Sequence, residues 1–386
     1  MVARRLRLGF VGGGPGAFIG PVHRMAARLD DRYEIVAGAF SADPERGRTG
    51  ARDLRIAADR AYDDYNKMAA GEAARPDGID AVAIVTPNYL HHAVAKAFLA
   101  AGIHVICDKP MAVSPAQALD LAATVRDTGL VFGLTHNYTG YPMARQARAM
   151  VEAGELGSIR IVQVEYAQDW LATKLEATDQ KQAAWRTDPA RSGPAGCLAD
   201  IGTHAYHLAR FVTGLDCVEV AAELTGFVPD RRVDDNIQAM LRFTGGARGM
   251  VWASQVAPGH ANDLRLRVYG EKAGLTWRQE EPDRLWFAPL GEAGRVLRRG
   301  GAGAGAAARQ ASRLPAGHPE GYIEAFAQLY ADLAEQITAH RERRAPEPAS
   351  LLVPGVEAGV DTARFVAAAL ESSRRNASWI ALAAMR

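Results

Sequence analysis

The chain has 386 residues, and its 48% hydrophobic and 23% charged residues are typical of globular proteins, which excludes fibrous repeats and extended disorder. Its 45 Lys and Arg residues nearly balance 44 Asp and Glu residues, and a formal charge of +1 offers no electrostatic basis for binding nucleic acid or a membrane surface. No apolar run approaches the roughly 20 residues of a membrane-spanning helix. The length predicts two domains.

The cysteines and the N-terminus indicate a reducing compartment. Cys107, Cys197 and Cys217 form no Cys-x-x-Cys motif and cannot all pair with one another. The Arg4-Arg5 pair is similar to the start of a twin-arginine signal, but glycines at 12–14 interrupt the apolar stretch that follows. We therefore expect a mature N-terminus and a cytoplasmic protein.

The first 139 residues alternate short apolar runs with helical patterns, which is typical of a parallel sheet built from βαβ units. The predicted strands are rich in Val, Ile, Phe and Leu, as expected of strands buried on both faces: Leu6–Val11, Glu34–Phe40, Ala81–Val85, His104–Cys107 and Val131–Leu134. The predicted helices are Val22–Leu29, Pro44–Leu54, His91–Ala101 and Pro115–Thr128. We assign residues 1–139 to a doubly wound α/β domain.

Residues 140–386 follow a different pattern, with longer runs that alternate polar and apolar residues. Such runs predict a large, open and mainly antiparallel sheet with one buried face: Ile159–Tyr166, Asn236–Phe243, Gly249–Gln255 and Leu264–Tyr269. Helices at Tyr322–His340 and Gly355–Ser372 close the chain and are candidates to pack back on the first domain. The segment Gly300–Ala308 is rich in Gly and Ala, and we expect a mobile loop there.

A glycine-rich turn joins the first predicted strand to the first helix. Gly12, Gly14 and Gly20 supply bare backbone at the N-terminal end of a helix, where N–H groups can bind a pyrophosphate. The spacing to the last glycine is three residues longer than in the usual dinucleotide fingerprint, and a glycine-rich turn without a ligand is the alternative. The position between strand and helix in the first βαβ unit favours a dinucleotide site.

The end of the second predicted strand distinguishes NAD from NADP. An acid there binds the ribose 2′-hydroxyl of NAD, but this chain has Ser41, and Arg46 follows. A hydroxyl and a guanidinium suit a 2′-phosphate, so NADP is favoured slightly over NAD. Two alternatives stay open: Arg46 lies on the solvated face of the next helix, or Asp43 reaches the ribose.

Lys109 follows the predicted strand His104–Cys107, at the strand end where open α/β sheets place their ligands. A lysine there can hydrogen-bond a substrate hydroxyl. The alternative is a surface lysine whose stem packs on apolar neighbours.

Asp200 and His204 are four residues apart. If Asp200 opens a helix, the two side chains share one face, and the carboxylate orients the imidazole as a general base. Two alternatives remain: Asp200 only caps the helix beside a core histidine, or the pair binds a metal together with His207. No cysteine pair or further carboxylate cluster supports a metal, so none is predicted.

These motifs occur together in one order along the chain: the glycine turn, Thr86-Pro87-Asn88 with His91, Asp108-Lys109-Pro110, and the segment 196–204. In this combination the chain resembles the Gfo/Idh/MocA family of NAD(P)-dependent oxidoreductases over nearly its full length. The resemblance implies an N-terminal Rossmann domain and a C-terminal α/β domain for substrate binding and oligomerisation.

The resemblance also implies roles for individual residues. The catalytic lysine is Lys109, and the Asp/His pair is Asp200 and His204. The residues expected to bind the cofactor, besides the glycines, Ser41 and Arg46, are Thr86, Pro87, Asn88, His91, Asp108, Lys109, Pro110, Trp185 and Arg186. Asn137, Tyr138 and His207 are expected on the substrate side, although Tyr138 equally suits packing between domains. Asp108 replaces the family's Glu, and His207 stands where an acid is frequent.

From these residues we expect reversible hydride transfer between a secondary alcohol of a sugar, glycoside or cyclitol and NAD(P). A non-catalytic NAD(P) sensor and a redox-neutral, NAD-dependent glycosidase are the alternatives. The expected partner is a small polyol or sugar, with neither nucleic acid nor membrane, and the resemblance implies a homodimer or homotetramer.

Overall fold

The computed structural model describes residues 4–385, and the chain divides into two compact units. Unit 1 contains residues 4–112, 116–137 and 322–360, and unit 2 contains residues 113–115, 138–321 and 361–385. The main break lies between Asn137 and Tyr138, close to the predicted boundary at 139/140. The roles assigned to the two domains stay predictions.

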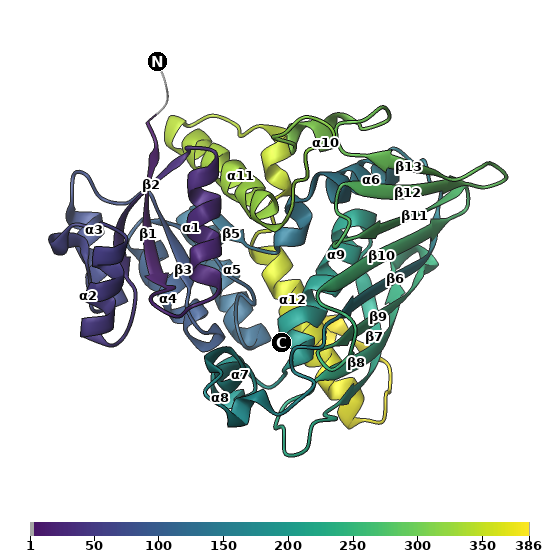
Figure 1. The fold of residues 1–386 in the computed structure, drawn as a ribbon, viewed down its shortest axis with the longest axis horizontal. Coiled ribbons are helices and arrows are strands. Elements are labelled where there is room, and N and C mark those ends of the chain that lie inside the picture. Colours follow the sequence, from purple (N-terminus) through teal and green to yellow (C-terminus); the bar gives the residue numbers. More distant parts are fainter. Residues whose placement is uncertain (1–3, 386) are drawn as a thin grey trace. The chain divides into compact units, whose positions relative to one another are not determined.

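Unit 1 is built on a five-stranded parallel sheet in the order β2-β1-β3-β4-β5 (Figure 1). Its strands are buried on both faces, which is why they are nearly continuous apolar runs in the sequence. Their bounds are β1 (Leu6–Gly12), β2 (Tyr33–Ala39), β3 (Ala81–Val85), β4 (His104–Cys107) and β5 (Phe132–Leu134). The predicted doubly wound parallel sheet is confirmed.

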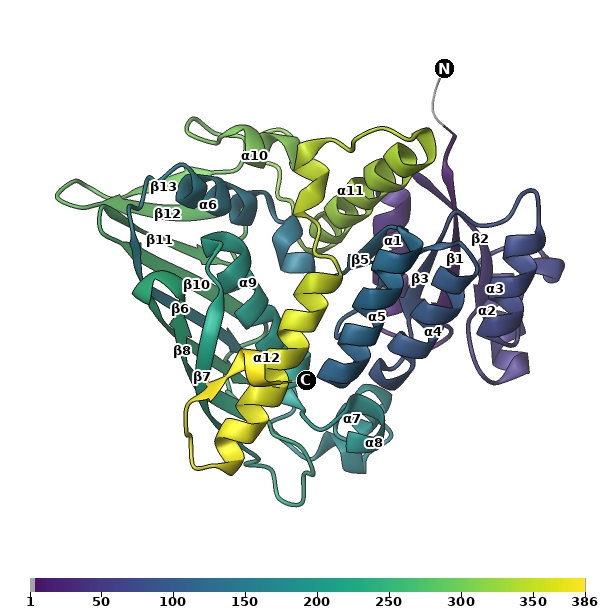
Figure 2. The same ribbon diagram turned by 180° about the vertical axis from the view of Figure 1, so that it is seen from behind.

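Helices cover both faces of this sheet, with α1 and α11 on one face and α4 and α5 on the other (Figures 1 and 2). The helix α11 packs along α1, and buried side chains of both helices join the core over β1. The helices of unit 1 are α1 (Ile19–Leu29), α2 (Pro44–Asp53), α3 (Tyr65–Ala74), α4 (Asn88–Ala100), α5 (Pro115–Thr128) and α11 (Tyr322–Glu342).

Helices α1 and α4 begin earlier than predicted. The predicted bounds were Val22 and His91, but Pro21 lies in the first turn of α1 and Pro87 immediately precedes α4. The first four N–H groups of a helix have no intrahelical partner, so a proline there removes no hydrogen bond. Helix α3 was not predicted. It begins where the Asp64 carboxylate accepts hydrogen bonds from the backbone N–H groups of Asn66 and Lys67.

Unit 2 contains a nine-stranded sheet in the order β13-β12-β11-β10-β6-β9-β8-β7-β14. Only β6 and β9 pair in parallel, so the prediction of a mainly antiparallel sheet is confirmed. The strands are β6 (Ile159–Ala167), β7 (Cys217–Thr225), β8 (Asn236–Phe243), β9 (Arg248–Ser254), β10 (Asp263–Gly270), β11 (Ala273–Arg278), β12 (Arg284–Pro289), β13 (Arg295–Arg298) and β14 (Ile380–Ala381).

Helices α6 (Pro142–Glu152) and α9 (Thr203–Thr213) pack on one face of this sheet. The alternation along β10 shows why: Leu264, Leu266 and Val268 are fully buried, whereas Arg265 and Arg267 between them are partly exposed. Large apolar side chains lie on the opposite face with exposures from 38% to 55%: Ile161, Met240, Met250, Tyr269 and Trp286.

The segment Gly300–Ala308, predicted as a mobile loop, ends in a short helix, α10 (Ala306–Gln310). This helix packs on α6, and the side-chain carbonyl of Gln146 accepts a hydrogen bond from Gly305 N–H. The prediction is therefore wrong for residues 306–308, because the alanines that look featureless in sequence are small enough to pack against α6.

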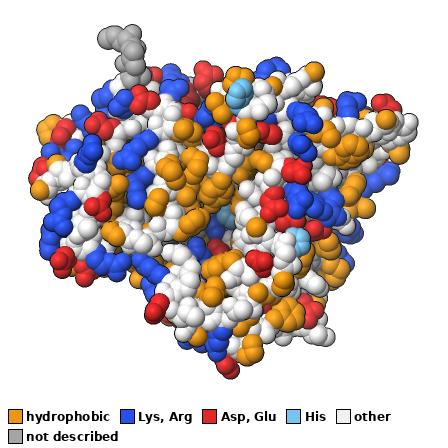
Figure 3. Space-filling view, in the orientation of Figure 1, with side chains coloured by type: hydrophobic (Ala, Val, Ile, Leu, Met, Phe, Trp, Pro, Cys, Tyr) orange, Lys and Arg blue, Asp and Glu red, His pale blue; other side chains and the backbone are white. Residues whose placement is uncertain are grey.

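No helix in the described part of the chain is long and apolar enough to span a membrane. On the face drawn in Figure 3, Lys and Arg side chains are interspersed with Asp and Glu on both units, in keeping with the nearly balanced charge.

Candidate active site

The glycine turn after β1 leaves no room for side chains. A Cβ on Gly14 would lie 2.5 Å from the carbonyl oxygen of Phe40, and one on Gly20 would lie 2.5 Å from Gly13 Cα. Gly12 and Gly13 have φ angles of +86° and +68°, which favour glycine. The turn thus brings bare backbone to the start of α1, a geometry that fits a dinucleotide pyrophosphate.

Ser41, Asp43 and Arg46 form a connected group between β2 and α2. Asp43 caps α2 by accepting a hydrogen bond from Arg46 N–H at 2.8 Å, and its own N–H donates to Ser41 Oγ. The Arg46 guanidinium donates to the carbonyl of Pro15 in the glycine turn at 3.2 Å. Arg46 is therefore tied to the turn, and the Asp43 carboxylate is engaged as a helix cap.

His91 links two of the predicted cofactor-binding segments. Its Nδ1 lies 2.7 Å from the carbonyl oxygen of Pro110, and its Nε2 lies 2.8 Å from that of Thr86. The imidazole thus holds the chain after β3 against the chain after β4. The hydroxyl of Thr86 is buried and has no hydrogen-bond partner among the described residues, so it is available to a bound molecule.

The Asp108-Lys109-Pro110 segment follows β4 and has a cis peptide bond between Lys109 and Pro110. Asp108 fixes the segment: its Oδ1 accepts hydrogen bonds from Thr135 Oγ1 and from Lys109 N–H, both at 2.9 Å. His23 of α1 lies behind it, with Nε2 3.9 Å from Asp108 Oδ1. Burial lowers the pKa of His23 to about 4, so this imidazole is neutral near pH 7.

Asn137 ends unit 1 with a buried side chain whose amide oxygen and nitrogen have no partner among the described residues. A buried amide without hydrogen bonds is costly, and a bound ligand with both donors and acceptors removes the cost. The Thr86 hydroxyl and the glycine turn fit a polar cofactor at the strand ends of unit 1, and the Asn137 amide fits a polar ligand such as the substrate.

Asp200 does not open a regular helix, which corrects the prediction. It lies within a π-helical turn (Leu198–Gly202), and α9 begins at Thr203. π-turns are frequent at functional sites because the extra residue redirects side chains. Asp200 Oδ2 accepts a hydrogen bond from Gln255 Nε2 at 2.8 Å and lies 3.4 Å from Nε of Arg186.

Trp185 and Arg186 belong to α7 (Lys181–Arg186) in unit 2. The Arg186 guanidinium lies over the Trp185 ring at 4.3 Å and near the Trp170 ring at 5.9 Å. It also donates to Gln182 Oε1 at 2.6 Å. Arg186 is thus held in place while its charge faces Asp200.

His204 lies in the first turn of α9 and is 7% exposed. Tyr138 packs edge-on against its ring, with the ring centroids 4.9 Å apart. The Tyr138 hydroxyl bonds that of Tyr166, which donates to Asn262 Oδ1 at 2.8 Å. Burial raises the pKa of Tyr138 to about 12, so the phenol stays protonated and serves as a neutral hydrogen-bonding group beside the imidazole.

His207 lies one turn further along α9 and stacks on Phe211. Burial, with Arg210 and Arg148 nearby, lowers the pKa of His207 to about 3. The side chain is therefore neutral near pH 7. Residues 4–385 contain no group of three or more His, Cys, Asp or Glu arranged to hold a metal ion.

The structure brings the predicted residues together in two sets, one at the strand ends of unit 1 and one around the π-turn and α9 of unit 2. Sequence reasoning missed Gln255 and Asn262, which contact Asp200 and Tyr166 respectively. Their only sequence signal is position, since Gln255 follows β9 directly and Asn262 directly precedes β10.

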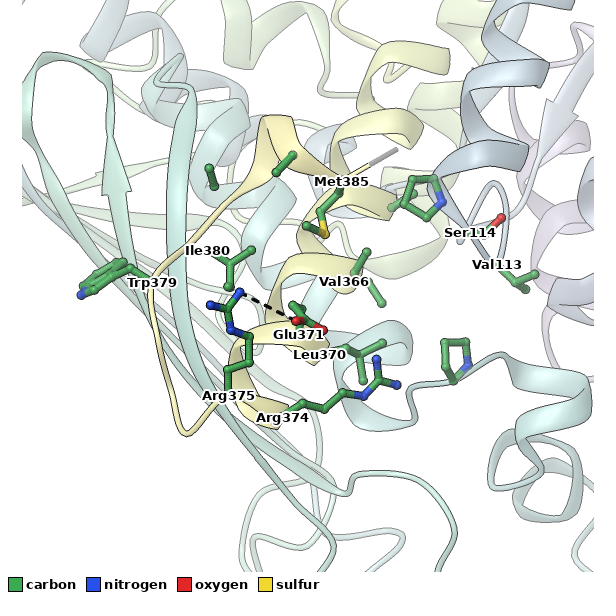
Figure 4. A pocket seen from close by; sticks show the side chains of 16 residues that line it. Val113, Ser114, Val366, Leu370, Glu371, Arg374, Arg375, Trp379, Ile380 and Met385 are labelled. Carbon is green, nitrogen blue, oxygen red and sulfur yellow. Dashed lines mark ion pairs between the residues drawn. The ribbon is translucent and has the colours of Figure 1, made fainter.

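Two cavities in unit 2, of about 610 Å³ and about 800 Å³, contain none of the predicted site residues. The first lies between the end of α12 (Val356–Arg374) and the C-terminal segment, as Figure 4 shows. The second lies beside β8 and β9, next to the ion pair of Lys174 and Asp230.

Known proteins match both halves of the chain. Residues 6–136 match the family described as "Oxidoreductase family, NAD-binding Rossmann fold", and residues 144–276 match the family described as "GFO/IDH/MocA C-terminal domain". A Bacillus subtilis (strain 168) protein named Uncharacterized oxidoreductase YfiI is 33% identical over 383 residues, covering 98% of each chain. The chain belongs to the Gfo/Idh/MocA family.

Solved structures of this family are similar over nearly the whole chain. An oxidoreductase from Sinorhizobium meliloti is 49% identical, with a TM-score of 0.89 and coverage of 98% of this chain and 100% of that one. An inositol dehydrogenase homolog from Azotobacter vinelandii, complexed with NADH and myo-inositol, is 35% identical, with a TM-score of 0.91 and 98% coverage of both chains. As a member of this family, the chain is an oxidoreductase with an NAD-binding Rossmann domain.

Proposed function

We propose that this enzyme transfers a hydride reversibly between a ring CH–OH group of a cyclitol or sugar and a nicotinamide dinucleotide. One observation carries the proposal: a nearly buried imidazole, His204, follows by one helical turn a carboxylate, Asp200, that two donors hold. An alcohol loses its proton readily only to a positioned base, and a histidine is suited to that role near neutral pH.

Each catalytic residue has a separate task. His204 takes the hydroxyl proton, and Asp200 stabilises the imidazolium that results. Lys109 donates a hydrogen bond to the same oxygen and stabilises the negative charge that develops on it. A bound nicotinamide supplies the hydride acceptor or donor. Burial keeps two other histidines, His23 and His207, neutral near pH 7 by lowering their pKa values to about 4 and about 3.

The residues proposed to hold the cofactor are those at the strand ends of unit 1, with Trp185 and Arg186 from unit 2. Ser41 and Arg46 favour NADP, and one oxygen of the Asp43 carboxylate is already engaged as a helix cap. The Azotobacter vinelandii homolog contains NADH, which favours NAD. The NADP preference therefore stays a prediction, to be measured as the ratio of kcat/KM for the two cofactors.

The proposed substrate is a cyclitol, with sugars and glycosides as the wider class. The homolog with myo-inositol supports this class, as does the polar group beside His204. Asn137, Tyr138 and His207 are the proposed substrate-side residues. Asn137 offers an unpartnered donor and acceptor, and Tyr138 and His207 offer neutral hydrogen-bonding groups, which suit hydroxyls better than charged ligands.

The test is reduction of NAD⁺ and of NADP⁺ across inositols, aldoses and glucosides, with Lys109→Ala as the control. We expect a polyol that reduces the cofactor with the wild-type enzyme, and a loss of about 10²–10⁴ in kcat with the variant. No reduction with any compound, despite cofactor binding, would contradict the proposal and favour a sensor. Conversion of a glucoside without net reduction would favour a redox-neutral glycosidase.

The exposed face of the nine-stranded sheet is proposed to pack on a second copy of the chain, giving a homodimer or homotetramer. Its large apolar side chains, Met240 at 55% exposure and Ile161 at 46% among them, favour burial against a partner. Sedimentation should give an oligomer for the wild type and a smaller species for Met240→Glu. A monomeric wild type at micromolar concentration would refute this arrangement.

A further inference from the structure

We propose that Asp234 is a positioning residue that fixes the turn carrying Asp200 and His204. The inference rests on the proposed function, because it assigns a supporting role to the same site. Asp234 lies just before β8, 34 residues after Asp200 in the chain, and touches none of the groups proposed to react.

Asp234 binds three successive backbone N–H groups, of residues 196–198, where the π-turn begins. Its Oδ1 accepts from Gly196 N–H and its Oδ2 from Leu198 N–H, both at 2.7 Å. Its main-chain carbonyl accepts from Cys197 N–H at 2.9 Å. Hydrogen bonds to a buried carboxylate are short and strong, so this residue sets the path of the chain over 196–198.

Gly196 allows the close contact with Asp234 and also bonds to the backbone of Asp200. A Cβ at this position would lie 2.3 Å from the carbonyl oxygen of Asp234, so any other residue would push the two segments apart. The carbonyl of Gly196 in turn accepts the N–H of Asp200 at 2.9 Å. One residue, Gly196, therefore connects the Asp234 carboxylate to the backbone of the proposed catalytic aspartate.

The side chain of Asp200 is tied to the same segment by a second route. The residue after Asp234, Asp235, accepts through its carbonyl the N–H of Gln255 at 2.9 Å. The Gln255 side chain donates to Asp200 Oδ2. Residues 234–235 thus position both the backbone and the carboxylate of Asp200. Neither residue belongs to the motif at 196–204 that the sequence analysis identified.

The Asp234 carboxylate depends on these bonds. It is buried, and burial raises its pKa to about 6 even though the N–H groups of Leu198 and Gly196 act in the opposite direction. An amide in its place offers one acceptor only, and its NH2 group opposes the second N–H donor. Asp234→Asn therefore loosens the turn without removing any group of the proposed chemistry.

The test compares Asp234→Asn with Asp235→Asn in the full-length protein. Asp235→Asn is the control because the buried Asp235 carboxylate accepts the N–H groups of Phe227 and Val228 and pairs with Arg231. Only the main-chain carbonyl of Asp235, which the substitution keeps, holds Gln255. We expect Asp234→Asn to lower kcat by about 10- to 100-fold with cofactor affinity unchanged. Amide hydrogen exchange at residues 196–198 should accelerate. Asp235→Asn should lower stability only, and Asp234→Glu should recover part of kcat.

A second variant guards against simple misfolding. If Asp234→Asn does not fold, Gly196→Ala provides the same displacement from the other side, and the same loss of kcat is expected. Wild-type kcat in the folded variants, unchanged exchange at 196–198, or an equal loss of kcat in Asp235→Asn would overturn the inference. If the wild type turns over no polyol, the proposed function fails, and hydrogen exchange alone then decides whether Asp234 fixes the turn.

Discussion

At the scale of single residues, the candidate site depends on partners that hold its charged groups. Asp200 accepts a hydrogen bond from Gln255 and forms an ion pair with Arg186. Arg186 in turn lies over the Trp185 ring and donates to Gln182. Asp108 accepts hydrogen bonds from the Thr135 hydroxyl and from the N–H of Lys109. Each carboxylate is thus oriented by a donor distant in the chain, Gln255 for Asp200 and Thr135 for Asp108.

Gln255→Leu removes one of the two donors to Asp200. We expect kcat to fall about 10-fold, because the carboxylate then turns toward Arg186 alone and no longer faces the imidazolium correctly. Steady-state kinetics measures the effect, with Gln238→Leu on the exposed side of β8 as the control. Equal values of kcat in both variants would remove Gln255 from the account.

Ser41→Asp tests the cofactor prediction. A carboxylate at the end of β2 favours the ribose hydroxyls of NAD and repels the 2′-phosphate of NADP. We expect the ratio of kcat/KM for NAD to that for NADP to rise about 10-fold or more, about 1.4 kcal/mol or more. An unchanged ratio would mean that Ser41 does not lie at the ribose, whichever cofactor the wild type prefers.

At the scale of elements, the glycine turn shows how close packing shapes a candidate binding site. Gly20→Ala would place a Cβ against Gly13 Cα at 2.5 Å and displace the turn from the start of α1. We expect weaker cofactor binding by at least about 10-fold in a calorimetric titration. Gly321→Ala is the control, because its Cβ would meet nothing within 4 Å and its φ is not positive. Equal affinities would argue against pyrophosphate binding at this turn.

The same scale shows which elements the sequence could predict. The strands of unit 1 can be predicted from the sequence because burial on both faces requires continuous apolar residues. Strands β3 and β4 have the predicted bounds. Strands β12 and β13 were not predicted: the apolar Trp286 and Val296 lie on the exposed face, so polar and apolar residues do not alternate at this edge of the sheet. Helix α3 was missed because its apolar residues lack a clear helical period, so its capping by Asp64 was overlooked.

The residues of the candidate site likewise fall into those that a sequence motif marks and those that it does not. Lys109 and the glycine turn were predictable because a strand end or a short motif marks each of them. The partners were not, because Gln255 lies 55 residues from Asp200 and Asp234 lies 38 residues from Gly196 along the chain. Such contacts depend on how β8 and β9 pair in the sheet, which single-sequence patterns do not encode.

At the scale of the whole molecule, buried histidines make stability depend on pH. Burial lowers the pKa of His23 and His104 to about 4 and that of His207 to about 3. Between about pH 6.5 and these values the unfolded chain binds more protons than the folded one, so the free energy of unfolding falls as pH falls. Each histidine contributes up to about 1.4 kcal/mol per pH unit.

Urea unfolding between about pH 7 and pH 5 measures this slope. His23→Gln should remove the contribution of one histidine to the slope of unfolding free energy against pH. His318→Gln, at an exposed position, should leave the slope unchanged. An identical slope in the wild type and in His23→Gln would show that His23 does not titrate on unfolding.

The central claim is that a ring hydrogen of a polyol moves to a nicotinamide with the help of Lys109 and His204. The most direct measurement uses polyols deuterated at every ring carbon, with NMR detection of deuterium in the reduced nicotinamide. We predict deuterium in the product for the wild type, and little or none for Lys109→Ala and His204→Ala. Cofactor binding without deuterium transfer from any polyol of the panel would contradict the account.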